Sequence, residues 1–244
     1  MHDDGFFDEA IAATYDEYSA GMFAPEVVTP AVDFLARLAG DGPGLEFGIG
    51  TGRIALPLAA RGIEVHGIDL STAMVTRLRA KPGADAIDVT IGDVAHARVE
   101  GTFSLVYLIF STIGNLITQE QQVACFCNAA EHLEPGGCFV IEVGIPALRS
   151  LPPGTSRLVF QWADDRWGID DYRVAEQMLT SHHFWREDGE IGHASMPYRY
   201  VWPSELDLMA RIAGLRLRER WGGWNREPFT DDSEMHVSVW EKPG

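Results

Sequence analysis

The stretch GLEFGIGTGRIALPLAARG at 44–62, followed by IEVHGIDLS at 63–71, decides the fold of this chain. A short apolar strand leads through Glu46 into three alternating glycines and a helical pattern, and a second apolar strand ends on Asp69. This order predicts a βαβ unit, in which the glycine turn lets the backbone approach a ligand and helix N–H groups point at it. The carboxylate that ends the second strand can accept hydrogen bonds from both hydroxyls of a ribose. The stretch therefore predicts a nucleoside site.

The spacing of the glycines indicates which kind of nucleoside is bound. The dinucleotide fingerprint is G-x-G-x-x-G, whose third glycine packs helix against strand so that a pyrophosphate can be seated. Here the glycines are Gly48, Gly50 and Gly52, and Arg53 takes the place of the third glycine of the fingerprint. This spacing favours a nucleoside without a pyrophosphate over a nicotinamide dinucleotide.

With these residues the chain resembles the class I S-adenosylmethionine (SAM)-dependent methyltransferases, by motif over roughly 10–147 and by element order beyond. In that family an E/D-x-G-x-G-T-G segment approaches the methionine part of SAM. The acidic residue after the second strand holds the ribose, and a Gly-Asp pair after the third strand reads the adenine. This sequence carries the three motifs as 46–52, Asp69 and Gly92-Asp93. Three motifs in order are far more specific than one glycine turn.

The resemblance implies a role for individual residues at the carboxyl ends of the strands, where open α/β sheets bind their ligands. Asp69 would accept from the ribose hydroxyls, Asp93 from the adenine amino group, and the Val94 N–H would donate to the ring. The full set of expected SAM contacts is Tyr15, Tyr18, Glu46, Gly48, Gly50, Gly52, Arg53, Asp69, Leu70, Met74, Asp93, Val94 and Phe110.

Some of these residues have a plainer interpretation. Tyr15 and Tyr18 match a Tyr-rich N-terminal helix that folds over SAM in relatives, but burial in an ordinary helix would explain both rings nearly as well. Met74 fits helix packing better than adenine contact, and Asp93 could be a turn carboxylate. The family enzymes that this chain is similar to include glycine N-methyltransferase and the amino-sugar N,N-dimethyltransferases. The sugar enzymes' F-S-S-I-G-Y-L segment corresponds to FSTIGNL at 110–116, where Asn115 replaces the tyrosine.

Capping residues, prolines and apolar periodicity place the other elements. Helices are expected at 8–20, from Thr29-Pro30 to Gly40, after Gly52, from Ser71, from Thr118 to Leu133, and at 203–214. Strands are expected at 44–48, 63–68, 87–91, 103–110 and 138–143, with LRLRERW and MHVSVWEK as an antiparallel closing pair.

A change of pattern between 155 and 202 indicates an inserted sheet. The helical period disappears there, aromatic residues alternate with polar ones, and Asp188-Gly189 predicts a hairpin turn between two such runs. We therefore expect an α/β fold, a Rossmann-like seven-stranded methyltransferase sheet with an inserted antiparallel lid of three or four strands. A single methyltransferase domain over 1–244 would hold a SAM-binding core at 40–147, the lid at 155–202, and a closing helix and strands at 203–241.

The lid is expected to hold the methyl acceptor. Because SAM brings its own leaving group, the protein has only to bind it, orient the acceptor and exclude water. Aromatic walls suit an apolar or ring-shaped small molecule. Of His182 and His183, at most one can face the acceptor as a general base, because neighbouring strand residues point to opposite faces. Either histidine could instead only hydrogen-bond within the sheet. No metal site is expected, since the histidines lack ligand spacing.

Composition bounds the partners. The chain has 36 acidic and 19 basic residues, a net charge of −17, which disfavours nucleic acid or an anionic membrane as partner. Three cysteines and a start, MHDDGFFDEA, without an apolar leader favour a cytoplasmic enzyme. The exposed aromatic alternation of the lid would also suit a homodimer interface.

Three functions remain open at this level. The most favoured is a SAM-dependent methyltransferase that acts on a small-molecule acceptor by N- or O-methylation, with natural-product metabolism as a setting. The others are a SAM-binding protein without catalysis and an NAD-dependent dehydrogenase. The sequence does not identify the acceptor.

Overall fold

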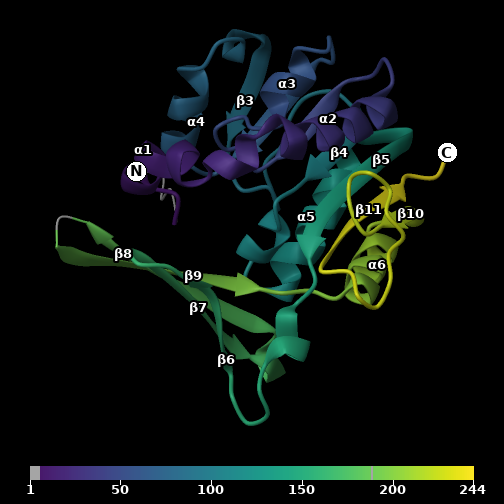
Figure 1. The fold of residues 1–244 in the computed structure, drawn as a ribbon. Coiled ribbons are helices and arrows are strands. Elements are labelled where there is room, and N and C mark those ends of the chain that lie inside the picture. Colours follow the sequence, from purple (N-terminus) through teal and green to yellow (C-terminus); the bar gives the residue numbers. More distant parts are fainter. Residues whose placement is uncertain (1–5, 188) are drawn as a thin grey trace.

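The computed structural model describes residues 6–187 and 189–244, and two β-sheets organise them (Figure 1). The larger sheet has the strand order β10-β11-β5-β4-β1-β2-β3. Strands β1 to β5 pair in parallel, whereas β11 runs antiparallel to both β5 and β10. The predicted seven-stranded sheet with an antiparallel closing pair is confirmed. Its strands are β1 (Gly44–Phe47), β2 (Val65–Asp69), β3 (Ile87–Ile91), β4 (Phe103–Leu108), β5 (Leu133–Gly144), β10 (Arg216–Trp221) and β11 (Met235–Glu241).

Helices cover both faces of this sheet (Figure 1). One face packs against α2 (Pro25–Ala39), α3 (Ala55–Ala59) and α4 (Thr72–Arg79), and the other against α5 (Gln119–His132) and α6 (Pro203–Ile212). Strand β4 shows why its sequence is nearly all apolar. Leu105 and Tyr107 pack in the core on the side of α2, α3 and α4, and Val106 packs in the core on the side of α5 and α6. A parallel strand covered on both sides has no solvated face.

Helix α2 begins at Pro25, upstream of the predicted start at Thr29-Pro30, so that prediction was wrong. Pro25 occupies the first turn of the helix and follows an extended Ala24. A proline there loses no intrahelical hydrogen bond, because the first N–H groups have no partner in any case. Pro30 lies inside the helix, where it leaves the carbonyl of the exposed Glu26 without its usual N–H.

The second sheet is the inserted lid, with strand order β6-β7-β8-β9 and antiparallel pairing throughout. Its strands are β6 (Arg157–Trp162), β7 (Arg166–Arg173), β8 (Met178–Glu187) and β9 (Glu190–Arg199). Glu187 pairs with Glu190, so the predicted hairpin is confirmed, and Gly189 has a φ of +86° in its turn. Asp188 of the predicted turn lies outside the described residues.

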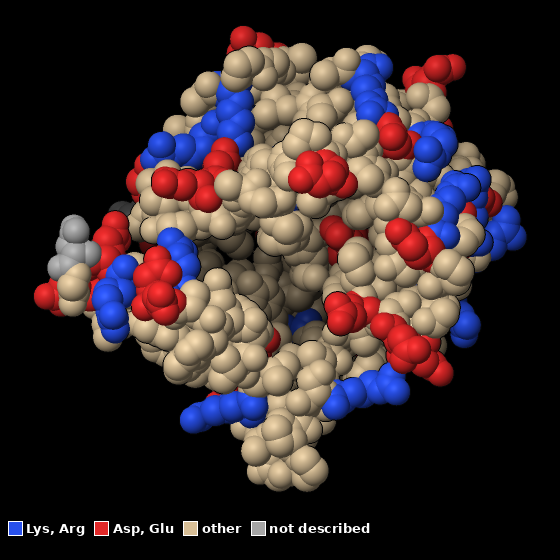
Figure 2. Space-filling model, in the orientation of Figure 1, with Lys and Arg blue, Asp and Glu red and all other residues tan. Residues whose placement is uncertain are grey.

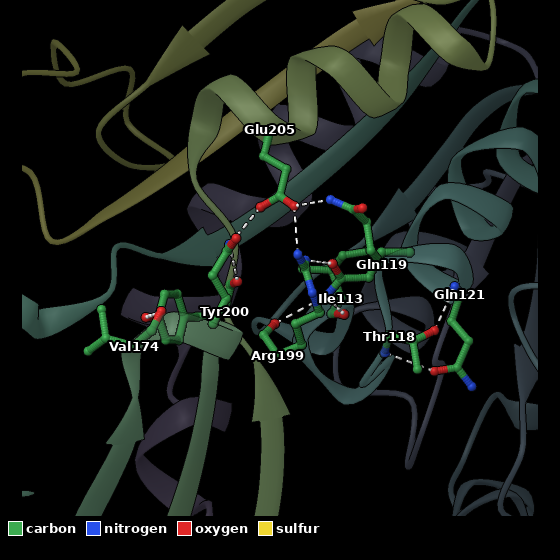
Figure 3. Close-up of polar contacts among 10 residues, drawn as sticks. Ile113, Thr118, Gln119, Gln121, Val174, Arg199, Tyr200 and Glu205 are labelled. Atoms are coloured by element: carbon green, nitrogen blue, oxygen red, sulfur yellow. Dashed lines mark hydrogen bonds and ion pairs between the residues drawn. The ribbon is translucent and has the colours of Figure 1, made fainter. Parts of the chain in front are cut away.

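A polar network joins the lid to the core (Figure 3). Arg199, the last residue of β9, donates to Glu205 of α6 at 2.7 Å and also bonds to Gln122 of α5. The Glu205 carboxylate accepts further hydrogen bonds from Gln119 and Gln177, both at 2.8 Å. Burial acts to raise the pKa of Glu205, but the bonds from Arg199, Gln177 and Gln119 outweigh it and leave the pKa lowered. The charged pair therefore fixes the base of the lid.

The remaining helices are short or lie at the N-terminal end of the chain. Helix α1 (Glu9–Tyr18) packs on α4, and its N-terminus is capped by the Asp8 side chain, which accepts from the Ile11 N–H. The 3-10 turns are η1 (Ala20–Phe23), η2 (Ala84–Ala86), η3 (Thr112–Asn115), η4 (Ala147–Ser150) and η5 (Val174–Glu176).

Candidate active site

A pocket lies at the carboxyl ends of β1 and β4, under α1. In Figure 2 the molecule is hollowed between the body of the large sheet and the lid sheet. The pocket is lined by Tyr15, Glu46, Gly48, Ile49, Gly50, Thr51, Arg53, Ile109, Phe110 and Thr112. Six of these ten residues belong to the set of cofactor contacts expected from the sequence, which places the glycine turn in the wall of the pocket.

The glycines of the turn serve two different purposes. Gly50 has a φ of +54°, and a Cβ placed on it would meet only Met74 Cε, at the ordinary contact distance of 3.5 Å. Gly52 has a φ of +82°, and a Cβ there would lie 2.3 Å from Leu78 Cδ1 of α4. Gly52 is thus required for packing beneath the turn. Gly50 leaves the backbone open on the pocket side.

Asp69 ties the end of β2 to the glycine turn. Its Oδ2 accepts from the Gly50 N–H at 2.6 Å and its Oδ1 from the Ser71 N–H at 2.8 Å. Helix α4 is capped by Ser71, whose hydroxyl accepts from the Met74 N–H at 3.0 Å, as the sequence predicted. Ser71, and not Asp69, therefore caps α4, and the Asp69 carboxylate is held beside the glycine turn.

Glu46 is a buried acid in the same wall. Its side chain is 3% exposed, and the Tyr107 hydroxyl donates to its Oε2 at 3.1 Å. Burial raises the pKa of Glu46 to about 8, against the opposing hydrogen bond from Tyr107 and the charge of Arg53. A carboxyl with this pKa is largely protonated at neutral pH.

Helix α1 is fastened over the pocket by Asp16. The Thr51 hydroxyl donates to Asp16 at 2.5 Å, and Lys81 both pairs with Asp16 and donates to the Thr51 carbonyl at 2.8 Å. This places Tyr15 in the pocket wall. Tyr18 is instead 52% exposed, with the Arg166 guanidinium of the lid 4.3 Å from its ring centroid. Tyr15 therefore lines the pocket, whereas the Tyr18 ring contacts the lid, and the expectation that both tyrosines meet the cofactor stays a prediction.

The segment after β4 supplies the opposite wall. Phe110 and Ser111 adopt left-handed backbone conformations, with φ of 57° and 56°, which is costly for residues other than glycine. The Phe110 N–H is held by the Glu142 carboxylate at 2.8 Å. The Arg53 guanidinium lies 5.0 Å from the Phe110 ring centroid and donates to the Met22 carbonyl. Strain at a ligand-facing turn is a frequent mark of a functional site.

The expected adenine residues lie beside Asp69 rather than in the main pocket wall. The Gly92 N–H donates to the Asp69 carbonyl at 2.8 Å, so the turn after β3 adjoins the end of β2. Asp93 accepts from the Ala95 N–H at 2.8 Å and Val94 is buried. Leu70 is 43% exposed at this edge.

Met74 is buried under the turn with Ala12 and Ala73, which is the plainer of the two interpretations that its position allowed. Its thioether lies beneath Gly50 and forms the floor on which the glycine turn rests.

One face of the lid sheet is turned toward this pocket. Residues opposite one another in an antiparallel ladder share a face, and successive residues alternate. The register therefore puts Arg166, His183 and Tyr198 on one face. That face meets α1 through Arg166 and Tyr18, and meets η3 because a Cβ on Gly114 would lie 3.4 Å from Tyr198 Cδ1.

His182 and His183 point to opposite faces, as predicted. On the pocket side, His183 Nε2 lies 3.2 Å from Ser181 Oγ. Burial lowers the pKa of His183, although Asp170 acts in the other direction, so the ring is uncharged at neutral pH. On the far face, His182 Nδ1 lies 2.8 Å from Ser195 Oγ. His182 is thus removed as a candidate base, because its ring faces away from the pocket.

Sequence reasoning missed Asp170 and Tyr198, which share the pocket-facing side with His183. Alternation alone would have placed Asp170 on a defined face of β7, but only the strand register shows that this is also the face of His183. Within the described residues, no group of three or more His, Cys, Asp or Glu side chains could hold a metal ion. None of the described helices is long and apolar enough to cross a membrane.

Comparison with known proteins decides the family. Residues 45–137 match the methyltransferase domain family. The whole chain resembles the solved structure of the CcbJ methyltransferase from Streptomyces caelestis, with 36% identity and a TM-score of 0.88 over 99% of this chain and 100% of that one. The chain belongs to the class I SAM-dependent methyltransferases. Its cofactor is therefore SAM, which agrees with the glycine spacing.

Two curated relatives of this methyltransferase are enzymes of Streptomyces. It is 27% identical to a cypemycin N-terminal methyltransferase of Streptomyces sp over 261 aligned positions, covering 99% of this chain and 100% of the relative. A segment of 81 residues is 38% identical to the dTDP-3-amino-3,4,6-trideoxy-alpha-D-glucopyranose N,N-dimethyltransferase of Streptomyces venezuelae, covering 32% of each chain.

Proposed function

We propose that this methyltransferase transfers the SAM methyl group to the nitrogen of a small-molecule amine in natural-product metabolism. The observation that carries the proposal is the lid face turned toward the pocket, which presents aromatic side chains and the uncharged His183. One curated relative is named an N,N-dimethyltransferase and the other an N-terminal methyltransferase, which favours nitrogen over oxygen as the acceptor atom.

The cofactor would lie along the carboxyl edge of β1, β2 and β3. We assign the methionine part to the glycine turn and Glu46, the ribose to Asp69, and the adenine to Asp93 and the Val94 N–H, with Leu70 at its side. SAM, when bound, supplies a methyl group on a sulfonium, which is electrophilic without further activation. The exposed Phe110 and the α1 residue Tyr15 would close the pocket on the acceptor side.

His183 is proposed as the general base. An amine reaches the enzyme as an ammonium ion and must lose a proton before its lone pair can attack a methyl group. A neutral imidazole on the acceptor wall can take that proton. The depressed pKa of His183 keeps it in the accepting form at neutral pH.

The test is methyl transfer from SAM to a panel of amines and matched phenols, with products detected by the added mass of one methyl group. Amines should be methylated and phenols should not. His183→Ala should lower kcat by roughly 100-fold, the usual range for loss of a general base. His182→Ala is the matched control, since it removes the neighbouring imidazole from the other face. Equal loss in both variants, or products on phenols alone, would contradict the proposal.

We also propose that the outward face of the lid is the interface of a homodimer. One face of the sheet would then cover the acceptor, and the other would contact the second subunit. Val159, Trp162 and Ile191 share that face and are 52%, 77% and 64% exposed. Trp162→Asp should therefore yield monomers in sedimentation velocity with methyl transfer retained. A parent that sediments as a monomer would refute this.

The remaining assignments concern the setting of the enzyme. We propose one methyltransferase domain over 1–244 that acts in the cytoplasm without a nucleic-acid partner. The three cysteines are free, which suits a reducing compartment, and the net charge of −17 disfavours contact with phosphate backbones.

A further inference from the structure

The pocket-facing side of the lid carries a carboxylate, Asp170, in the middle of β7. Asp170 lies directly opposite Ser181 of β8, and the next residue across, on β9, is Met196. The Ser181 hydroxyl hydrogen-bonds to the Asp170 carboxyl and also lies 3.2 Å from His183 Nε2. Asp170, Ser181 and His183 therefore form one polar group on the pocket-facing side of the lid.

Within the described residues, one oxygen of this carboxyl lacks a partner. Asp170 Oδ1 is buried and accepts no hydrogen bond from them. Among the described residues, the titratable side chains that act on Asp170 are those of Ser181's neighbours His183 and His182, and no Lys or Arg is among them. Burial raises the pKa of Asp170 in spite of its bond to Ser181, as expected for a carboxyl without a counter-ion. Such a group is unfavourable unless a cation pairs with it.

The neighbouring Asp171 shows the contrast. It points to the outward face, where its carboxylate accepts from Ser156 Oγ at 2.8 Å and from Arg157 Nε at 3.0 Å. Those two donors lower the pKa of Asp171. Among the residues that the structure describes, the outward carboxylate thus has a cationic partner and the inward one does not.

Tyr198 connects Asp170 to the cofactor pocket. Its ring is half-buried on the same face, and burial raises the pKa of Tyr198 to about 12, with Tyr15 and Asp170 adding to the effect. Tyr198 is therefore near enough to Asp170 and to Tyr15, which lines the pocket, for both to act on it. A molecule bound at Asp170 would lie on the side of the lid that faces the proposed SAM site.

We propose that Asp170 binds the acceptor as a cation, and that the substrate class is a basic amine that is protonated at neutral pH. The inference rests on the proposed function and names the residue that selects the acceptor. One N–H of the ammonium would donate to Asp170 Oδ1, and a second would deliver its proton to His183. The freed lone pair forms the N–C bond while the C–S bond of SAM breaks and sulfur keeps the electron pair. The product is again an ammonium, and His183 returns its proton to water.

The experiment measures binding without turnover. Benzylamine and cyclohexylamine, with benzyl alcohol and cyclohexanol as neutral counterparts of the same shape, are titrated by calorimetry into protein saturated with S-adenosylhomocysteine. The parent should prefer each amine to its alcohol by at least tenfold, as expected for a hydrogen bond to a charged group. Asp170→Asn should abolish this preference while S-adenosylhomocysteine affinity changes less than twofold. Asp171→Asn, the matched control, should keep it.

Thermal unfolding separates this role from a structural one. Removing a buried unpaired charge should leave the melting temperature of Asp170→Asn equal to or above that of the parent, whereas removing a structural partner would lower it. If Asp170→Asn does not fold, Asp170→Ser takes its place in the same titrations. A preference retained in the variant, or amines and alcohols that bind the parent equally or not at all, would overturn the inference. Methylation of amines with an unchanged amine KM in Asp170→Asn would overturn it while leaving the proposed function standing. Selective amine binding by the parent without methyl transfer would overturn the proposed function while leaving this inference standing.

Discussion

Replacement of Glu46 by Gln tests whether burial in the wall of the pocket raises the pKa of the Glu46 carboxyl. Glu46 is 3% exposed, and its pKa is about 8 in the folded protein against an ordinary value of 4.5. Between these two pH values the folded state holds a proton that the unfolded chain releases. The stability from this proton is complete below pH 4.5 and is lost as the pH rises toward about 8. The slope is about 1.4 kcal/mol per pH unit.

The assay is chemical denaturation of the parent and Glu46→Gln, without SAM, at pH 5.5 and pH 7.5. Over these two pH units the parent should lose about 2.5 kcal/mol of unfolding free energy through Glu46, and the glutamine variant should lose none of it. The comparison cancels the titration of other groups, such as His236, whose pKa burial lowers to about 4. Glutamine also keeps an oxygen to accept from the Tyr107 hydroxyl.

Parallel pH profiles for the two proteins would refute this reasoning, because they would show that Glu46 is already ionised in the folded state.

A related measurement bears on function. If Glu46 meets the ammonium group of the methionine part, SAM binding at pH 7 should release a fraction of a proton. Calorimetry in two buffers with different ionisation enthalpies detects that release, and its absence in Glu46→Gln is the control.

Three further changes test other parts of the site. Asp69→Ala should weaken SAM binding by about 1.5–3 kcal/mol, the range for hydrogen bonds to a charged group, and calorimetry that finds parent-like affinity would refute the ribose assignment. Gly52→Ala should lower the unfolding free energy by about 1–3 kcal/mol, since its Cβ would lie 2.3 Å from Leu78, and a denaturation curve unchanged from the parent would contradict the packing role. Trp185 pairs with Arg166 and so shares the pocket-facing side of the lid. Trp185→Ala should change the amine KM or kcat while SAM affinity stays within about 0.5 kcal/mol, and a large loss of SAM affinity would contradict a role on the acceptor side.

Much of the fold could be predicted because the patterns that set the strands and sheets have few physical interpretations. The fully apolar β4 requires helices on both faces, and the alternating 155–202 segment can only be a half-exposed sheet. The start of α2 could not be predicted, since Pro25 and Pro30 are equally good first-turn residues locally. In the structure the helix begins at Pro25, and Val28 is the one residue between the two prolines that is buried.

The site was predictable where chemistry is encoded in adjacent residues, and less so where it depends on strand register. The glycine turn and Asp69 were found because a ribose contact must follow β2. The sequence did not separate Gly50 from Gly52, because the clash at Gly52 comes from Leu78 of α4, 26 positions away in the chain. Asp170 looked like any polar strand residue until the pairing of β7 with β8 placed it beside His183.

The measurement that tests the account most directly is calorimetric titration of SAM into the parent and into Gly50→Val. The account predicts stoichiometric binding by the parent. In the variant a β-branched side chain must adopt a φ near +54° where the backbone meets the cofactor, so binding should be lost. The melting temperature without SAM should fall only modestly, because a Cβ on Gly50 meets only Met74 Cε, at 3.5 Å. A folded variant that binds SAM with the affinity of the parent would show that the glycine turn is not the cofactor site.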